Sequence, residues 1–325
     1  MNSGEKASTE LSGLVVIDKP SGITSHDVVD RVRRVYEMSK VGHAGTLDPT
    51  ATGVMLVGLG RATRLLAFLQ PLSKSYRAVA KFGVSTTTQD AEGEITATTP
   101  SRLSVQDVEK AAVAFRGEIR QVPPMVSAVK VGGEPLYKAA RRGEVVERQA
   151  RSVRIYEFDI EDFDADAQTA KVFVRCSSGT YIRTLASDLG DALGYGAHLI
   201  SLRRMSVGSF GEDECVVLEE LEKMGLKASV QHILSMKEAL RDFPRITVDG
   251  ESRDAVVHGR TLGPDFVVDR PGELPLHPTG AAGGRPPHEA GLAAGLPIGV
   301  VDSDETLLAV YRRSAKGFKA AAVFV

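Results

Sequence analysis

The chain has 325 residues, of which 42% are hydrophobic and 25% are charged, and its formal net charge is −2 at pH 7. This length and composition predict a globular protein with a buried core, built as one large domain or as two domains. The near-neutral charge excludes a uniformly basic surface, so any site for nucleic acid must be a local basic face offset by acidic residues elsewhere.

The two cysteines, Cys176 and Cys215, are too few for a disulfide scaffold and do not have the Cys-x-x-Cys spacing of a metal site. Residues 1–12 are expected to form a disordered tail, because they are polar and contain no apolar segment of the kind found in signal peptides. No apolar run is long enough to span a bilayer. These features predict a reducing, cytoplasmic location.

The first predicted elements surround a turn. Residues 14–17 form a short apolar strand, and residues 18–22 contain the Pro and Gly typical of a turn. Thr24 and Asp27 are spaced like a helix-start capping box. Valines then recur at helical spacing, so we expect a basic amphipathic helix over residues 25–36.

The middle of the chain mixes strands with long loops. Residues 41–53 are rich in Gly, Thr and Pro and predict an ordered loop, and residues 54–59 and 75–82 predict strands. A helix is expected over residues 104–115. Residues 121–151 form a long excursion between elements, and such segments are usually functional or disordered.

Further elements follow this excursion. Residues 153–160 and 171–176 alternate as a strand pair. Residues 177–180 are expected to cap a helix that Gly190 closes at its carboxyl end. Another helix is expected over residues 230–240.

The composition of the sequence changes near Arg241, where we place a domain boundary. Residues 245–257 and 298–325 predict short strands. Between them, residues 264–295 are dense in Gly, Pro and Ala and predict a flexible insertion.

Charge is unevenly distributed along the chain. Residues 157–166 and 212–222 are acidic. Each basic cluster is, taken singly, most simply a solvated helix face. The basic clusters are Arg31, Arg33 and Arg34; Arg61 and Arg64; Lys74 and Arg77; Lys138, Arg141 and Arg142; and Arg203 and Arg204.

The common cofactor motifs are missing from the sequence. It contains no phosphate-binding Gly-x-x-x-x-Gly-Lys loop, no Gly-x-Gly-x-x-Gly fingerprint and no His-Glu-x-x-His zinc helix. The seven histidines are scattered along the chain. We therefore expect neither a metal nor a nucleotide cofactor.

The best candidate for chemistry is Asp48, in residues 42–49 (GHAGTLDP). Gly42 and Gly45 permit tight turns, and Pro49 biases Asp48 toward an extended backbone. A rigid loop of this kind can hold a carboxylate at a fixed point for covalent or acid–base chemistry. From spacing alone, a purely structural role for Asp48 is the more frequent one, because Asp before Pro is a common turn residue.

Two other side chains suit such a carboxylate. Arg183 is expected in the first turn of a helix, where it can pair with an acid in a bidentate manner and keep it ionised. Tyr76, expected on a strand, can stack on a planar base. Taken alone, Arg183 is more simply a surface arginine, and Tyr76 is more simply a core tyrosine.

Several ordered motifs resemble the TruB family of transfer-RNA pseudouridine synthases. They extend over about residues 13–208 and follow the family order. The motifs are residues 13–25 (GLVVIDKPSGITS), 40–53 (KVGHAGTLDPTATG), 74–78 (KSYRA), 89–93 (QDAEG), 122–130 (VPPMVSAVK), 178–185 (SGTYIRTL) and 202–204 (LRR).

The resemblance implies roles for individual residues. Asp48 matches the catalytic aspartate, Tyr76 the tyrosine that packs on the target base, and Arg183 the arginine that pairs with the aspartate. Asp90 matches an acid near that arginine, and Leu202 an apolar residue of the pocket. The residues that we expect to contact RNA are Lys19, His43, Arg141 and Arg142.

The resemblance also implies the architecture. We expect an α+β catalytic domain over residues 13–240, with a mixed, largely antiparallel sheet and flanking helices. Within it, residues 123–151 form a segment that clamps the T-arm of transfer RNA. Residues 241–325 resemble, more weakly, a small β-rich PUA-like domain.

The implied reaction converts the T-loop uridine at position 55 of transfer RNA to pseudouridine, without a cofactor, in a monomeric enzyme. The uridine must leave its stack before the carboxylate reaches it. Attack at C1′ of the sugar and attack at C6 of uracil both remain open. The alternatives are a non-catalytic RNA-binding or tRNA-folding chaperone on the same scaffold, and a guide-RNA-dependent relative.

Overall fold

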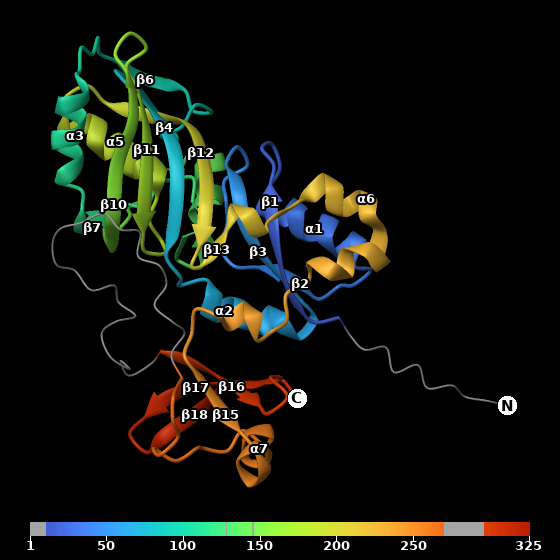
Figure 1. Cartoon of the computed structure of the whole chain (residues 1–325). Coiled ribbons are helices and arrows are strands. Elements are labelled where there is room, and N and C mark those ends of the chain that lie inside the picture. Colours follow the sequence, from blue (N-terminus) through green and yellow to red (C-terminus); the bar gives the residue numbers. More distant parts are fainter. Residues whose placement is uncertain (1–10, 128, 145, 270–295) are drawn as a thin grey trace.

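The described part of the protein, a computed structural model, contains a large sheet, a smaller C-terminal sheet and two short two-stranded hairpins (Figure 1). The structure describes residues 11–269 and 296–325, apart from residues 128 and 145. Most of the expected N-terminal tail and of the expected insertion at 264–295 therefore lies outside the described residues. No helix in the described part of the chain is long and apolar enough to cross a membrane.

The large sheet has ten strands and contains a path in the order β14-β1-β3-β12-β4-β11-β10-β7. Neighbours along this path are antiparallel, except that β1–β14 and β3–β12 are parallel. The prediction of a mixed, largely antiparallel sheet is confirmed. The strands are β1 (Gly13–Lys19), β2 (Val41–His43), β3 (Thr52–Leu59), β4 (Lys74–Phe82), β7 (Gly117–Gln121), β10 (Arg151–Asp164), β11 (Thr169–Cys176), β12 (Ala197–Val207), β13 (Phe210–Gly211) and β14 (Val216–Val217).

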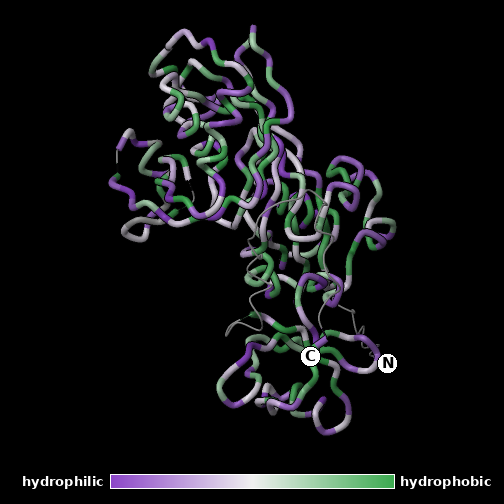
Figure 2. Tube along the Cα trace, turned by 60° about the vertical axis from the view of Figure 1, so that its left-hand side comes forward, coloured by the Kyte–Doolittle hydropathy of each residue, from purple (hydrophilic) through white to green (hydrophobic). Residues whose placement is uncertain are grey.

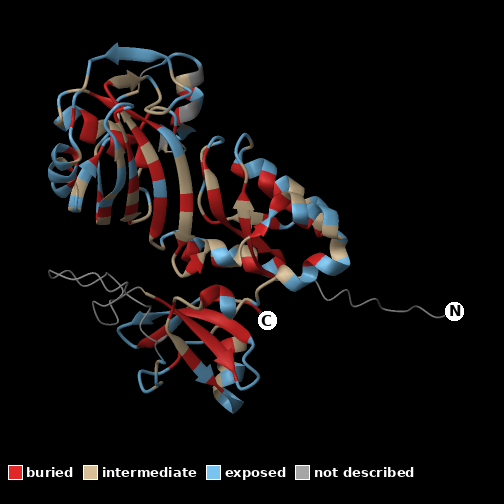
Figure 3. Ribbon diagram, turned by 45° about the horizontal axis from the view of Figure 1, so that its top comes forward, coloured by how far each residue is buried: buried red, intermediate tan, exposed pale blue. Residues whose placement is uncertain are grey.

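Two short hairpins lie outside this sheet. The first pairs β5 (Val84–Thr86) with β6 (Ile95–Thr98), and β6 is exposed along its whole length (Figure 3). The second pairs β8 (Lys130–Val131) with β9 (Glu134–Pro135) and precedes helix α4 (Leu136–Arg141). The predicted long excursion thus contains local structure of its own.

Helices cover the large sheet at its two ends (Figure 1). At one end α1 (Ser25–Val35) packs against the kinked helix α6 (Leu218–Ser229), and at the other α3 (Val105–Val113) and α5 (Ile182–Ala192) pack together. The capping box predicted at Thr24 and Asp27 is confirmed, since each residue bonds to the backbone of the other. A short segment, η1 (Gly60–Leu65) and α2 (Leu66–Leu69), lies between the two sheets.

Alternation of polar and apolar residues positions the strands. In β11 every second side chain is buried, and these join a core of β4, α3 and α5 residues. Along the trace, hydrophobic stretches gather in the sheets while hydrophilic ones occupy many of the connecting turns (Figure 2). Burying one face of each strand in this way provides the main stabilising free energy of such a sheet.

The prediction that Gly190 closes its helix was wrong. Gly190 lies inside α5, which ends at Ala192. A Cβ atom at Gly190 would lie 2.3 Å from the backbone nitrogen of Ala197. The glycine therefore allows close packing of the helix against the start of β12, rather than a left-handed helix end.

Two further predictions were wrong in the last third of the chain. A helix was expected over residues 230–240, but these residues form only short 3-10 turns, η3 (Val230–His232) and η4 (Glu238–Leu240). Between the turns Leu234 exchanges backbone hydrogen bonds with Leu14, which holds the segment extended. Strands were expected over residues 245–257, where the structure has one strand followed by helix α7 (Gly250–Val257).

The C-terminal region is a four-stranded sheet in the order β15-β16-β17-β18. The small β-rich region that was predicted is therefore present. It packs on α2 and η1 through a shared apolar cluster that includes Leu69 and Phe324. Its strands are β15 (Arg245–Val248), β16 (Pro297–Asp302), β17 (Leu307–Ser314) and β18 (Gly317–Val323).

Candidate active site

Residues 44–51 form the loop that connects β2 to β3, and Asp48 projects from it. The loop starts with a hydrogen bond from Ala44 N to Leu56 O and ends with one from Ala51 N to Asp48 O. Gly45 has a φ of +102°, which a residue with a Cβ rarely adopts. The sequence predicted a loop over residues 41–53, whereas the structure has strands at both ends of this range, β2 over Val41–His43 and β3 from Thr52, so that only residues 44–51 form the loop. Gly45 has the turn conformation expected of it, but Gly42 lies on β2.

Lys19, at the end of β1, supports this loop from beneath. Its Nζ donates to Pro49 O at 2.9 Å and to Ala51 O at 2.7 Å, as well as to Pro20 O at 2.9 Å. The side chain is fully buried, and burial lowers the pKa of Lys19 to about 8. Lys19 was predicted to contact RNA. Its position corrects this, because all three ammonium donors are already used inside the protein.

Arg204 supports the other end of the loop. Its Nε donates to Val54 O at 2.6 Å and its Nη2 to Gly45 O at 3.3 Å, and the residue is only 1% exposed. Arg203, next to it on β12, faces the opposite way and pairs with Asp18. Sequence reasoning missed this role, because residues 203 and 204 were considered together as one basic cluster. Assigning them to a strand would have separated them.

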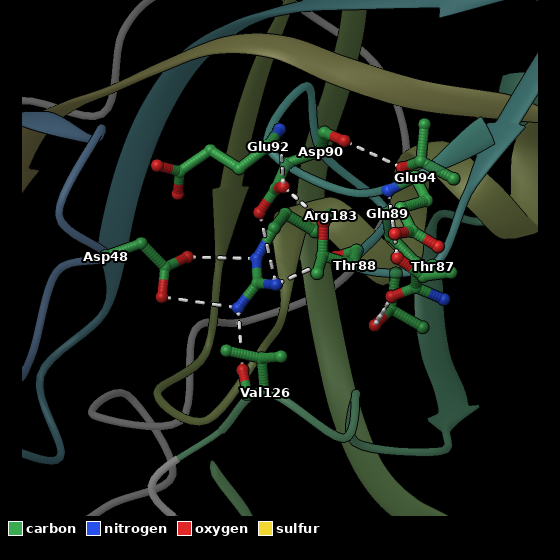
Figure 4. Close-up of polar contacts among 11 residues, drawn as sticks. Asp48, Thr87, Thr88, Gln89, Asp90, Glu92, Glu94, Val126 and Arg183 are labelled. Atoms are coloured by element: carbon green, nitrogen blue, oxygen red, sulfur yellow. Dashed lines mark hydrogen bonds and ion pairs between the residues drawn. The ribbon is translucent and has the colours of Figure 1, made fainter. Parts of the chain in front are cut away.

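Arg183, on the first turn of α5, pairs with Asp48 through both carboxylate oxygens (Figure 4). The Nε–Oδ2 distance is 2.9 Å, and Nη2 donates to Oδ1 at 3.2 Å. The Arg183 side chain is 5% exposed, whereas that of Asp48 is 34% exposed. Burial raises the pKa of Asp48, and the charge of Arg183 opposes this increase.

The remaining donors of Arg183 are also occupied. Nη1 donates to Thr88 O at 2.8 Å and lies 3.3 Å from Asp90 Oδ2, and Nη2 donates to Val126 O at 2.9 Å. These contacts and the two to Asp48 match the five N–H groups of a guanidinium. Asp90 therefore lies near Arg183, as the family resemblance implied, and contacts a guanidinium nitrogen, Nη1, that Asp48 does not contact (Figure 4).

Tyr76 lies on β4, in the same apolar cluster as Leu47 and Ala51 from the loop. Leu202, from the neighbouring strand β12, packs against this cluster. Burial raises the pKa of Tyr76 to about 12, and the guanidinium of Arg204 opposes this increase. The structure thus brings Tyr76 and Leu202 to the loop that carries Asp48.

The other residues that were predicted to contact RNA lie on different elements of the structure. His43 is the last residue of β2, and burial lowers its pKa below the ordinary histidine value. Arg142 is exposed and pairs with Glu134 at 2.7 Å and Glu144 at 2.8 Å. Arg141 is the last residue of α4.

Many charges of the predicted acidic and basic clusters pair with one another. In the acidic segment, Glu157 pairs with Arg175 and Glu161 with Arg77, across neighbouring strands or nearby on the same sheet. In the basic helix α1, Arg31 lies within 4 Å of the carboxylate of Glu222 on α6. Much of the expected segregation of charge is therefore local pairing on sheet and helix surfaces.

The arrangement presents an ionisable carboxylate whose two oxygens are held by one buried guanidinium. Such a group can act as a nucleophile or as an acid–base catalyst on a flat substrate beside Tyr76. Within the part of the chain that the structure describes, no group of three or more His, Cys, Asp or Glu residues is arranged to hold a metal ion.

Two family models together match residues 33–242. The model of the TruB family pseudouridylate synthase (N terminal domain) matches residues 33–182, which include Asp48 and Tyr76. The model of the tRNA pseudouridylate synthase B C-terminal domain matches residues 183–242, beginning at Arg183.

Similar proteins agree with these matches. The tRNA pseudouridine synthase B of Mycobacteroides abscessus is 49% identical over 258 residues, which cover 78% of this chain and 85% of that protein. The protein of the same name from Syntrophotalea carbinolica is 44% identical over 260 residues, or 80% and 84% of the two chains. Among solved structures, one chain of a Cbf5-Nop10-Gar1 complex has a TM-score of 0.73 and 25% identity, and the match covers 96% of this chain and 85% of that chain.

Proposed function

The chain belongs to the TruB family of pseudouridylate synthases, and we propose that it converts a uridine of transfer RNA to pseudouridine with Asp48 as the reacting carboxylate. The observation that carries this proposal is the bidentate pair between Asp48 and Arg183. These residues lie 135 positions apart in the chain, yet both oxygens of the carboxylate meet the same guanidinium. A binding module needs a basic surface but has no need for a buried pair of this kind.

Each residue of the site has a different role in the isomerisation. The target uridine first leaves its stack, which costs a few kcal/mol, and stacking on Tyr76 offsets about 1–3 kcal/mol of this. Arg183 keeps the carboxylate of Asp48 ionised against the effect of its burial. Leu202 and the surrounding apolar cluster exclude water from one side of the base.

The carboxylate has two possible points of attack. If it attacks C1′ of the sugar, uracil leaves with the electron pair of the N1–C1′ bond. The base then turns, C5 displaces the carboxylate from C1′, a proton leaves C5 and N1 gains one. If it adds to C6 of uracil instead, the glycosidic bond of the adduct breaks with its electron pair on N1, and C5 bonds to C1′. Loss of the C5 proton then expels Asp48 from C6, and N1 gains a proton. Both routes balance without an external reactant.

We propose that the substrate is the T-loop uridine at position 55 and that residues 123–151 clamp the T-arm. Support comes from Val126, which belongs to this segment and whose carbonyl accepts a hydrogen bond from Arg183. Docking of the segment is thereby linked to the active-site arginine. Identity of 44–49% to two proteins named tRNA pseudouridine synthase B, against 25% to one chain of the Cbf5-Nop10-Gar1 complex, supports transfer RNA as the substrate.

The remaining parts of the proposal concern the oligomeric state, the cellular location and the C-terminal domain of the enzyme. We propose a monomer that acts in the cytoplasm, where transfer RNA is used; the pair between Asp48 and Arg183 forms within a single chain, so it requires no second subunit. The four-stranded C-terminal sheet supports a PUA-like domain, with its boundary near Arg241, that assists RNA binding.

The experiment for this substrate uses transfer-RNA transcripts labelled with tritium at C5 of uracil. The purified protein alone is expected to release label from the native transcript, but not from one whose T-loop uridine 55 is replaced by cytidine. Release from both transcripts would contradict the position. Binding without any release would favour the chaperone, and release only after addition of a guide RNA would favour the guide-dependent relative.

A further inference from the structure

Ser25, the first residue of α1, touches the active-site loop at the residue before Asp48. Its Oγ accepts a hydrogen bond from Leu47 N at 2.9 Å and donates one to Leu47 O at 3.1 Å. Ser25 is 2% exposed and Leu47 is 4% exposed, so water does not compete for these bonds. One hydroxyl group thus satisfies both backbone polar groups of a single buried residue.

The second of these bonds bears directly on Asp48. The carbonyl of Leu47 belongs to the same planar peptide unit as the backbone nitrogen of Asp48. Fixing the plane of that unit restricts rotation about the bond that leads into Asp48, and so restricts the direction in which its carboxylate points. On the other side of Asp48, the carbonyl of Pro49 is held by Gly22 N at 2.9 Å and by Lys19.

Ser25 itself is held rigidly. It lies between Thr24 and Asp27, the two residues of the reciprocal capping box, and Val28 and Val32 on the same helix are fully buried. A hydroxyl on the first turn of a helix that is both capped and packed has little freedom to follow a moving loop. The helix therefore acts as a fixed reference for the position of the loop.

We propose that Ser25 is a positioning residue of the reaction: its hydroxyl fixes the Leu47–Asp48 peptide plane and thereby aims the carboxylate of Asp48. This inference rests on the proposed function of Asp48. Ser25 does not meet the reacting atoms in this account. Its contribution is to orientation, which accelerates a reaction only when the reacting group is held near its working geometry.

The chain offers a matched control in Ser229, at the end of α6. Ser229 is 0% exposed, and its Oγ donates to Leu226 O at 2.9 Å. Its own carbonyl accepts a hydrogen bond from the hydroxyl of Tyr36, beside the other end of α1. Replacing either serine by alanine therefore removes a buried hydroxyl, but only Ser25 contacts the loop of Asp48.

The test compares Ser25→Ala, Ser25→Cys and Ser229→Ala in the full-length protein, by single-turnover tritium release, transfer-RNA binding and thermal unfolding. Both alanine variants are expected to lower the melting temperature by a similar amount, about 2–8 °C. Ser25→Ala is expected to slow the bound-state reaction about 10- to 100-fold with transfer-RNA affinity changed by no more than about twofold, whereas Ser229→Ala keeps the wild-type rate. Ser25→Cys, which keeps a weaker donor and acceptor of similar shape, is expected to react at an intermediate rate.

Equal rates in Ser25→Ala and Ser229→Ala, in folded protein saturated with transfer RNA, would overturn the inference. So would a loss confined to affinity. If Ser25→Ala does not fold, Ser25→Cys decides alone, and a wild-type rate in that variant counts against the role. Asp48→Asn measured alongside separates this failure from that of the proposed function, because an inactive Asp48→Asn leaves the function intact even if Ser25 proves neutral.

Discussion

Arg183 holds Asp48 by two contacts, Nε to Oδ2 at 2.9 Å and Nη2 to Oδ1 at 3.2 Å, and is itself almost completely buried. A buried guanidinium that meets both oxygens of a carboxylate fixes its plane as well as its charge. The pair therefore orients Asp48 and favours its ionised form, while burial acts in the opposite direction on its pKa.

Removing Arg183 is expected to shift the pH dependence of the reaction. The ionised form of Asp48 is required, so activity is lost as the pH falls through the pKa of Asp48. Arg183→Met removes the charge that opposes the effect of burial, and the pKa of Asp48 rises further. The acidic limb of single-turnover rate against pH is therefore expected to move to higher pH, with a large loss of rate and a small loss of affinity.

The control for Arg183 is Arg175→Met, which breaks a half-buried pair with Glu157 outside the site. It is expected to leave the acidic limb in place. An unshifted limb in Arg183→Met, or equal losses of rate and affinity, would contradict the assigned role.

Lys19→Met is expected to impair the loop rather than RNA binding. The change removes three hydrogen bonds to backbone carbonyls, two of them on the loop of Asp48, so both the rate and the melting temperature should fall. The dependence of affinity on salt should not change, because Lys19 is buried. The measurement is the slope of log K against log salt concentration.

The comparison for Lys19 is Arg142→Met, at an exposed position in the clamp segment. If Arg142 contacts a phosphate, this change reduces the slope by about one. A reduction of that size in Lys19→Met would return Lys19 to the RNA interface.

Gly190→Ala is expected to destabilise the catalytic domain although alanine favours helices. The added Cβ would lie 2.3 Å from Ala197 N and 2.4 Å from the carbonyl carbon of Gly196, both backbone atoms that cannot move freely. Overpacking of this kind costs about 1–3 kcal/mol, more than the gain of up to about 1 kcal/mol in helix propensity. Urea unfolding measures the difference, and Gly263→Ala, which has open space around it, is the control. A stabilised Gly190→Ala would contradict the close packing of α5 against the start of β12.

The end of the chain is expected to attach the small sheet to the catalytic domain. Phe324 is 2% exposed in the shared apolar cluster, and its carbonyl accepts a hydrogen bond from Arg61 at 2.6 Å. Phe324→Ala should cost about 3–5 kcal/mol of packing and loosen this interface. Limited proteolysis near Arg241 should then become faster, while Val325→Ala, at an exposed residue, leaves the pattern unchanged. Equal cleavage of both variants would mean that other contacts hold the interface.

Much of the fold could be predicted from local sequence patterns. The capping box of α1, the alternation in β4 and β11, and the loop around Gly45 are set by neighbours in sequence, and all were predicted correctly. Helices α6 and α7 were missed. α6 contains Gly225 in a left-handed conformation, which interrupts the periodicity on which its recognition depends.

The geometry of the site depended on long-range contacts that periodicity cannot reveal. Lys19 resembled a surface cation by type, but its burial follows from the carbonyls of a loop 30 positions later. Arg204 likewise differs from Arg203 only because a strand turns alternate side chains to opposite faces. The pairing of Asp48 with Arg183 was predicted from the family resemblance. From spacing alone, Asp48 is more simply a turn residue and Arg183 a surface arginine.

The most direct test of the account is tritium release from C5-labelled transfer RNA by Asp48→Asn, measured in a single turnover beside the wild-type protein. The substitution keeps the size of the side chain and removes its charge. The variant is expected to bind transfer RNA with wild-type affinity, within about threefold, and to release no label above background. Release at the wild-type rate would contradict the assignment of Asp48 as the reacting carboxylate.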